Sequence, residues 1–312
     1  MENKEKNFVS AVIYVRNCEK TIGVFLSSVI KVMEENFEHS EIVCVNDDSS
    51  DASVDIIKKA VSNTINTSVT VVNLSYYHGL EVAMTAGMDL AIGDFVFEFD
   101  NTIMDYEEEF IMNVYRHSLE GFDIVSASPN KRVSFSSRVF YRVFDRFSNL
   151  DYKMTTESFR VLSRRVINRI GSMNKTIPYR KVVYAESGLK TDNLKYDVKQ
   201  SVKTSYDKET RSYRAELASD SLILFTEMGY RLTKLMTAVM MLFSIIMIVY
   251  TVAVYMFGHP IEGWTTTVLF LSIAFFGLFC IMTIVVKYLQ LIIDMVFKRK
   301  HYSFESIEKI TK

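Results

Sequence analysis

The most informative segment of this sequence is Gly93-Asp94-Phe95-Val96-Phe97-Glu98-Phe99-Asp100-Asn101-Thr102. Its first half is aromatic and β-branched and follows a Gly-Asp turn, which predicts a buried strand. Ligands of parallel α/β sheets bind outside the carboxyl ends of the strands, so we expect Asp100 to face a substrate. A Mg²⁺ ion that bridges phosphates typically takes one or two protein carboxylates. The alternative is an aspartate that only caps the next turn.

The residues before this segment alternate between strand and helix patterns. Strands are predicted over 9–15, 41–45 and 69–74, and helices over 21–35, 54–62 and 82–91. Four strands that alternate with helices imply a mostly parallel sheet with right-handed crossovers. The sequence therefore predicts an α/β domain.

An acidic turn follows the second predicted strand. It contains Asp47, Asp48 and Asp51. At the carboxyl end of a strand, such side chains suit a ribose or a uracil imide. Ser50 or Asp51 is expected to cap the following helix, and capping explains one of the three carboxylates.

Two long apolar runs occupy the last third of the chain. Residues 235–257 contain no charged residue over 23 positions, and residues 265–286 form a second run of the same kind. At about 1.5 Å per residue, each run is long enough to cross a ~30 Å hydrocarbon core. Two transmembrane helices are predicted, with two buried helices of a soluble bundle as the alternative.

The loop charges predict the orientation of these spans. The connector at 258–264 has no Lys or Arg, whereas Arg231 and Lys234 precede the first run and Lys287 follows the second. Both termini are therefore expected in the cytoplasm of a multi-pass protein. The first thirty residues lack an apolar signal segment, and three scattered cysteines fit a reducing compartment.

The charge of the chain reverses near residue 131. Residues 1–130 hold 8 Lys+Arg against 22 Asp+Glu, and residues 131–214 hold 20 against 8. A basic segment ahead of two membrane spans points to a bilayer surface, a phosphorylated lipid or a diphosphate, with nucleic acid as the competing partner. Apolar and basic residues at helical spacing over 135–146 predict a helix on the membrane or on a cleft.

Taken together and in order, these motifs resemble those of the family-2 glycosyltransferases with a GT-A fold. The likeness is to the polyprenyl-phosphate, or dolichol-phosphate mannosyltransferase-like, members of the bacterial two-span type. The segments that carry it are Val12–Asn17, Val45–Asp51, Gly79–Ala83 with Ala86-Gly87, Gly93–Thr102 and Ser158–Arg165.

The resemblance implies three regions: a cytoplasmic GT-A domain over 1–205, juxtamembrane amphipathic helices over 206–234, and a two-helix transmembrane domain with a short cytoplasmic tail over 235–312. It also implies site residues. Catalytic roles fall to Asp100, Arg160 and Glu157; nucleotide binding falls to Asn17, Asp47, Asp48, Asp51, Gly79 and Glu81; Mg²⁺ or Mn²⁺ binding falls to Asp100 and Thr102.

The sequence departs from the family pattern at two functional positions. Thr102 replaces the second aspartate of the metal motif, and Ser158 replaces the aspartate of the acceptor segment. A sugar hydroxyl needs a general base, but a phosphate monoester is largely anionic at neutral pH because its second pKa is near 6. The loss at Ser158 therefore favours a lipid-phosphate acceptor, held by Arg160, Arg164, Lys181 or their neighbours.

The predicted protein is a membrane-anchored inverting glycosyltransferase of the cell (inner) membrane. It would move a sugar from a nucleotide sugar, most simply a UDP-sugar, to polyprenyl phosphate for surface polysaccharide or glycan modification. Its partners would be these two substrates and the lipid bilayer, without nucleic acid, and a homo-oligomer is left open. The alternative is a non-catalytic scaffold that binds nucleotide sugar or lipid. A processive synthase is disfavoured because the sequence lacks a Gln-x-x-Arg-Trp motif.

Overall fold

The computed structural model describes residues 4–64, 66–130, 156–172, 179–199 and 302–311, with isolated positions at 142 and between 235 and 292. The chain divides into two compact units, the first made of residues 1–145, 150–218 and 300–312, and the second of 146–149 and 219–299. Every element below belongs to the first unit.

Several predictions fall outside the described residues. These are the helix over 135–146, the juxtamembrane helices over 206–234 and, apart from isolated positions, both apolar runs. Within the described ranges, no helix combines the length and the apolar character needed to cross a bilayer.

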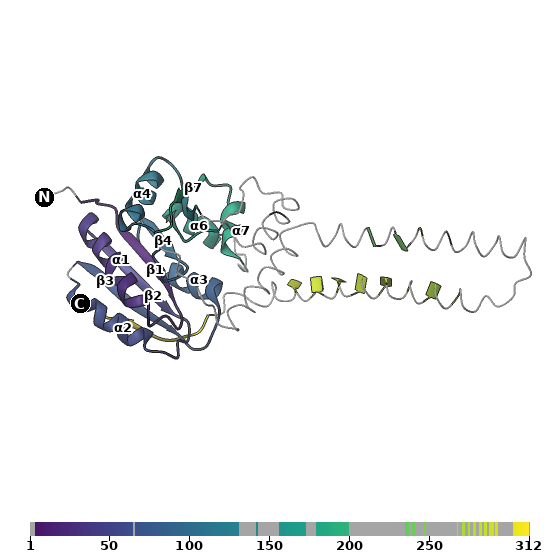
Figure 1. Cartoon of the computed structure of the whole chain (residues 1–312), viewed down its shortest axis with the longest axis horizontal. Helices are drawn as coiled ribbons and strands as arrows, with labels where there is room; N and C mark the ends of the chain where they lie inside the picture. Colours follow the sequence, from purple (N-terminus) through teal and green to yellow (C-terminus); the bar gives the residue numbers. More distant parts are fainter. Residues whose placement is uncertain are drawn as a thin grey trace, which may run out of the picture. The chain divides into compact units, whose positions relative to one another are not determined.

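The described residues form one eight-stranded sheet with helices on both faces (Figure 1). The strands are β1 (Val9–Val15), β2 (Ser40–Asn46), β3 (Thr67–Leu74), β4 (Phe95–Phe99), β5 (Ile124–Pro129), β6 (Phe159–Ser163), β7 (Thr191–Tyr196) and β8 (Phe304–Lys309). The helices are α1 (Ile22–Asn36), α2 (Ser53–Ala60), α3 (Leu80–Leu90), α4 (Glu108–Leu119), α6 (Arg164–Ser172) and α7 (Arg180–Glu186), with a 3₁₀ turn at Val61–Asn63.

The first four strands confirm the predicted parallel arrangement. The sheet order is β7-β5-β6-β4-β1-β2-β3-β8, and β1 pairs in parallel with both β2 and β4. The chain therefore runs outward from β1 to β3 and then returns to the other side of β1. Ligands of α/β sheets bind at such a switch point, so the carboxyl ends of β1 and β4 are the place to look for a site.

Alternating residues of β1 divide the core into two layers. Val9, Ala11 and Ile13 pack against residues of α1, α2 and α4, whereas Val12 packs against α3 on the opposite face. Gly87 of α3 permits a close approach to the sheet, because a Cβ there would lie 2.4 Å from Cγ1 of Val12. The helix can therefore lie directly on β1 and β2.

Two strands differ from the sequence expectations. Phe159–Ser163 forms β6, which pairs antiparallel with both β4 and β5. From the sequence, these residues were identified only as part of the segment Ser158–Arg165 of the family resemblance. Phe304–Lys309, expected only as part of a short tail, forms β8 and pairs antiparallel with β3. The sheet is consequently mixed, and its far edge is formed by residues that follow both apolar runs.

Candidate functional site

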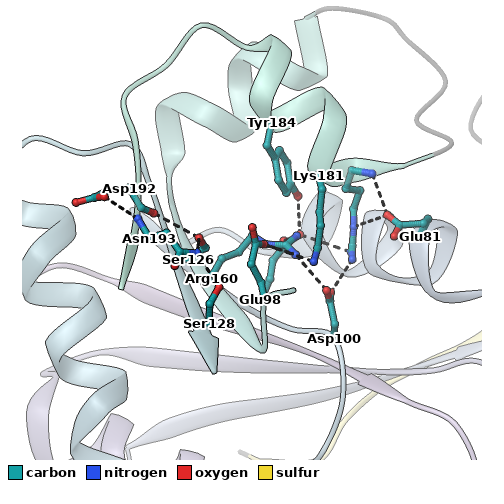
Figure 2. Close-up of polar contacts among 12 residues, drawn as sticks. Glu81, Glu98, Asp100, Ser126, Ser128, Arg160, Lys181, Tyr184, Asp192 and Asn193 are labelled. Carbon is teal, nitrogen blue, oxygen red and sulfur yellow. Dashed lines mark hydrogen bonds and ion pairs between the residues drawn. The ribbon is translucent and has the colours of Figure 1, made fainter. Parts of the chain in front are cut away.

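Asp100 follows β4 and lies between two arginine side chains (Figure 2). Its Oδ2 accepts a hydrogen bond from Nη2 of Arg160 at 3.1 Å, and its Oδ1 accepts one from Nη2 of Arg180 at 2.7 Å. The Asp100 side chain is 13% exposed, and the two arginine side chains are 1% and 2% exposed. Asp100 thus lies at the carboxyl end of a strand, as predicted, with both oxygens engaged.

Arg160 reaches Asp100 from β6, where it stands opposite Glu98 of β4. Its Nη1 donates to Oε2 of Glu98 at 2.7 Å, and its Nε donates to Oε2 of Glu157 at 3.1 Å. A buried guanidinium is tolerated only with close counter-ions, and three carboxylates supply them here. The structure therefore brings together the three residues with predicted catalytic roles, Asp100, Arg160 and Glu157.

Arg180 joins α7 to α3. Its backbone N–H and its Nε both donate to Oε2 of Glu81 at 3.0 Å. Its Nη1 lies 3.6 Å from Oε1 of Glu98, which also accepts a hydrogen bond from the hydroxyl of Tyr184 at 2.6 Å. Glu81, which the sequence places at the nucleotide, is the partner of Arg180 in the structure.

These side chains form a carboxylate–guanidinium cluster in which four carboxylates face three cations. Its members are Glu81, Glu98, Asp100, Glu157, Arg160, Arg180 and Lys181, the last with Nζ 3.7 Å from Oε2 of Glu157. Burial opposes ionisation of Asp100, but Arg160, Arg180 and Lys181 outweigh it and hold its pKa at about 2. Asp100 is therefore a carboxylate at neutral pH and a poor proton acceptor.

A polar row continues from the cluster across the sheet. Ser126 of β5 stands opposite Arg160, and Nδ2 of Asn193 on β7 donates to the hydroxyls of Ser126 and Ser128 at 2.7 Å each (Figure 2). Both serines are buried. These hydrogen bonds join β7 to β5, the strand that pairs with β6 at Arg160.

Asp47 lies inside the protein and holds three loops together. Its Oδ2 accepts hydrogen bonds from the hydroxyl of Tyr14 at 3.0 Å and from the N–H of Gly79 at 2.9 Å, and its Oδ1 accepts one from the N–H of His78 at 2.8 Å. Burial raises the pKa of Asp47 against the lowering effect of these donors. The side chain is completely buried, so in this arrangement Asp47 positions the loops and does not face solvent.

Asn17 and Asp48 are the exposed members of the predicted nucleotide site. Their backbones have φ values of 44° and 56°, in the left-handed region that L-residues rarely adopt. Strained residues of this kind gather at binding sites. Oδ1 of Asn17 accepts a hydrogen bond from the N–H of Ser50 at 2.9 Å, which links the loop after β1 to the acidic turn.

The N-cap of α2 is Ala52, so the predicted cap by Ser50 or Asp51 is wrong, and Asp51 instead bonds to groups beside the helix start. Its Oδ1 accepts a hydrogen bond from the N–H of Ser53 at 3.0 Å, and its Oδ2 accepts one from the N–H of Glu19 at 2.9 Å. Although burial opposes it, hydrogen bonding to the Ser53 hydroxyl and to these amides lowers the pKa of Asp51. Gly79, with φ of 85°, precedes α3 in a conformation that favours glycine. Of the three aspartates of the acidic turn, Asp48 alone is exposed.

The predicted metal pair Asp100 and Thr102 does not fit a metal site in this geometry. Both oxygens of Asp100 accept from arginines, and the buried hydroxyl of Thr102 shares a hydrogen bond with Oγ1 of Thr21 at 2.6 Å. Over the ranges that the structure describes, no group of three or more His, Cys, Asp or Glu side chains is arranged to hold a metal ion. A cation at Asp100 would have to share its oxygens with the two arginines.

Ser158, at the position where the resemblance expects an aspartate, is part of a hydrogen-bonded chain. The hydroxyl of Tyr196 donates to Oδ1 of Asp105 at 2.6 Å, so the Ser158 hydroxyl, 2.5 Å away, donates to Tyr196. Burial, together with the bond to Asp105, raises the pKa of Tyr196. Neither hydroxyl is a base at neutral pH.

Arg164, named from the sequence as a phosphate ligand, is placed away from Asp100. Its Nε donates to the carbonyl oxygen of Gly93 at 2.8 Å, and its Nη2 donates to that of Ala91 at 2.9 Å. Gly93 precedes β4 and Asp100 follows it, so the two lie at opposite ends of the strand. The Arg164 prediction is wrong because the side chain is committed to the turn that enters β4.

Sequence reasoning missed Glu98, Arg180 and Tyr184. One signal was available for Glu98: a carboxylate inside the apolar strand Phe95–Phe99 needs a buried cation. The contacts of Arg180 and Tyr184 depend on where α7 packs, which no local pattern encodes.

The comparisons with known proteins concern the family and the fold of the chain. The model of the family described as "Glycosyl transferase family 2" matches residues 10–171, more than half of the chain. The chain is 28% identical over 195 residues to an uncharacterized glycosyltransferase of Synechocystis sp., covering 61% of this chain and 60% of that protein. It is also 28% identical over 284 residues to a prophage bactoprenol glucosyl transferase homolog of Escherichia coli, covering 86% and 88%.

A solved structure shows the same fold. It is that of a mannosyltransferase from Pyrobaculum calidifontis in complex with GDP-Man and Mn²⁺, with a TM-score of 0.50 and 13% identity over 70% of this chain and 63% of that one. At this identity the likeness concerns the fold alone. On the family match, this chain belongs to family 2 of the glycosyltransferases.

Proposed function

We propose that this chain is a membrane-anchored inverting glycosyltransferase that moves a sugar from a nucleotide sugar, most simply a UDP-sugar, to a polyprenyl phosphate. The observation that carries the proposal is the engagement of the carboxylates around Asp100. Asp100 has a pKa of about 2, and Glu98 and Glu157 are bonded to Arg160. An acceptor hydroxyl would find no ready base among them, whereas a phosphate monoester arrives already ionised.

The reaction then needs no proton transfer. An oxygen of the lipid phosphate attacks the anomeric carbon of the donor, a new carbon–oxygen bond forms, and the bond to the nucleoside diphosphate breaks with its electron pair. In-line attack inverts the anomeric centre. Binding and alignment supply most of the rate in such a reaction.

We assign roles in this reaction from the exposure of the side chains. Among the three cations of the cluster, Lys181 is the most exposed, at 13%, and we assign it the contact with the anionic substrates. Arg160 and Arg180 are buried and fix the position of Asp100. Asn17 and Asp48 lie on the exposed loops where β1 and β2 end, and we assign them to the nucleotide.

Membrane anchoring by the apolar runs at 235–257 and 265–286 is part of the proposal. The name of the Escherichia coli relative, a bactoprenol glucosyl transferase homolog, supports a polyprenyl acceptor. The chain after both runs returns to the sheet of the first unit, because β8 (Phe304–Lys309) pairs with β3. Two spans satisfy that constraint, with the first unit in the cytoplasm.

The proposal is tested by a transfer assay. The purified full chain in vesicles receives undecaprenyl phosphate and one of several radiolabelled UDP-sugars, and label is counted in the organic phase. We expect label from one donor, and its loss in Asp100→Ala. An Asp100→Ala protein with full turnover would overturn the assignment of this site.

Metal dependence is decided in the same assay. Mg²⁺ or Mn²⁺ at Asp100 would compete with an arginine for each carboxylate oxygen. The transfer assay is therefore run with Mn²⁺, with Mg²⁺ and with a chelator. A site that binds a metal at Asp100 depends on the added ion, whereas a site that keeps its arginine contacts does not. Loss of label in the chelator alone would identify the first case.

A scaffold that binds nucleotide sugar or lipid without turnover is the second candidate. The pairing of both Asp100 oxygens with Arg160 and Arg180 favours it, since a metal-bound diphosphate would compete with two arginines for this carboxylate. Calorimetry distinguishes the two: a scaffold binds the donor but gives no label with any donor or metal.

A further inference from the structure

The C-terminal segment 302–311 pairs with β3 between Thr70 and Leu74. β8 pairs with β3 from Thr70↔Lys309 to Leu74↔Phe304, with an irregularity between Asn73 and Leu74. Beyond the strand, the N–H of Ser75 donates to the carbonyl oxygen of Ser303 at 2.9 Å, and the hydroxyl of Tyr302 donates to Asp89 at 2.6 Å. The segment is therefore held at its beginning as well as along its length.

A row of side chains runs from β8 to the acidic turn. Nδ2 of Asn73 on β3 donates to Oγ of Ser306 on β8 at 2.8 Å, and Nδ2 of Asn46 on β2 donates to Oδ1 of Asn73 at 2.9 Å. Oδ1 of Asn46 then accepts the N–H of Ser49 at 3.1 Å. Asn46 and Asn73 are each only 8% exposed, so each depends on the next for its hydrogen bonds.

A second connection runs through His78. The N–H of Ser303 donates to Nε2 of His78 at 3.2 Å, which places the ring proton on Nδ1, 2.5 Å from the carbonyl oxygen of Tyr76. The same histidine donates its backbone N–H to Asp47 at 2.8 Å. The segment is thus linked to the acidic turn 46–51 by two indirect routes, through Asn73 to Asn46 and through His78 to Asp47.

We propose that residues 302–311 position the acidic turn 46–51 for the donor, so that docking of this segment sets the affinity for the nucleotide. The inference rests on the proposed function only for the identity of the nucleotide. Asp48 is held at φ of 56° in this turn, next to Ser49, whose amide ends the Asn46–Asn73–Ser306 row. Without Ser306, the Asn73 amide keeps only a weaker contact with Glu308 at 3.4 Å, and the row loses its anchor.

This arrangement links two distant parts of the chain. Residues 302–311 follow the second apolar run at 265–286, and they reach the loops where β2 and β3 end. A displacement of the residues after that run would therefore be transmitted to the acidic turn through Ser303 and Ser306. The affinity for the donor would therefore depend on whether β8 is paired with β3.

The test uses the full chain with Ser306→Val, which keeps the strand but removes the hydroxyl. Its matched controls are Ser306→Thr, which restores the hydroxyl, and Glu305→Ala at an exposed neighbour on β8. Two readouts are taken: the Kd for UDP by calorimetry, and amide hydrogen exchange over 46–51. Ser306→Val should raise the Kd and speed the exchange by ~5-fold, as loss of one partly buried hydrogen bond implies. Both controls should match the unmodified chain.

His78→Phe is a second variant that avoids the buried row. It removes the acceptor for Ser303 but keeps the ring stacked on Tyr76 and the backbone N–H to Asp47. It should change both readouts in the same direction. A lowered melting temperature in Ser306→Val and His78→Phe, with unchanged Kd and unchanged exchange over 46–51, would show that the segment is merely structural and would overturn the inference.

The two proposals fail separately. If the unmodified chain binds no UDP, the UDP-sugar donor is wrong, but exchange over 46–51 still decides whether β8 positions the turn. If UDP binds and Ser306→Val leaves both readouts unchanged, the inference is wrong and the proposed function stands.

Discussion

Glu98 shows how one buried charge organises the site. It is completely buried in β4, and it bonds to Arg160 and Tyr184 while Arg180 lies 3.6 Å away. Two elements, β6 and α7, are thereby tied to β4, the strand whose end carries Asp100. Removing one partner of such a network leaves an uncompensated buried charge.

We therefore predict that Arg160→Met destabilises the first unit by about 3–5 kcal/mol, because Glu98 and Glu157 lose their counter-ion. The measurement is thermal unfolding of the purified full chain. Arg165→Met is the matched control, since this arginine is 68% exposed and its partner Asp123 keeps a hydrogen bond from the Ser163 hydroxyl at 3.0 Å. Its effect should be small. Equal effects of the two substitutions would contradict the importance of the buried cluster.

The low pKa of Asp100 predicts a specific acid dependence. A carboxylate whose folded pKa is about 2, below the ordinary 3.8, stabilises the fold above pH 4 and loses that contribution as the pH falls towards 2. The contribution is on the order of 2 kcal/mol. The stability difference between the unmodified chain and Asp100→Asn should shrink over this window. A difference that stays constant from pH 5 to pH 2.5 would refute the assigned pKa.

At the scale of elements, α3 depends on a glycine. Gly87→Ala would place a Cβ 2.4 Å from Val12 and 2.6 Å from Val45, so α3 would have to move off the sheet. We predict a loss of about 1–3 kcal/mol in unfolding free energy. Gly171→Ala in α6 is the control, because a Cβ there meets nothing within 4 Å. The added helix propensity should leave the stability unchanged or raise it.

The elements that the sequence predicts correctly are those with a strong local period. The strand at 9–15, the helix at 21–35 and the strand at 95–99 were each recognisable from apolar spacing, and their parallel order followed from the alternation. β6 was not recognised as a strand because it is five residues long and carries a buried arginine. β8 was missed because its partner, β3, is more than 200 residues away.

The site was predictable to a similar degree. Asp100 at a strand end and the acidic turn were visible as sequence patterns. Their contacts were not visible in the sequence. Asp47 accepts hydrogen bonds from Tyr14 and Gly79, and Asp100 accepts one from Arg180. These contacts depend on the packing of the whole fold. Local sequence therefore located the site but did not determine which oxygens are free.

At the scale of the whole molecule, the return of the chain to its own sheet is the main topological constraint. The first unit contains residues 1–145 and 300–312, so it includes chain from before and from after the two apolar runs. We predict that a tag in the connector 258–264 is accessible from outside intact spheroplasts, while a tag at residue 1 is not. Lysed cells serve as the control for tag exposure. Equal accessibility of both tags in intact spheroplasts would contradict the two-span topology.

The decisive measurement compares two acceptors that differ only in the phosphate. The purified chain in vesicles is given the same labelled nucleotide sugar with undecaprenyl phosphate or with undecaprenol. Because the described carboxylates near Asp100 are bonded to cations and Ser158 replaces the family aspartate, the account predicts label on the phosphate and none on the alcohol. Label on undecaprenol, at a rate comparable with that on the phosphate, would mean that the site does contain a working base and would contradict the account.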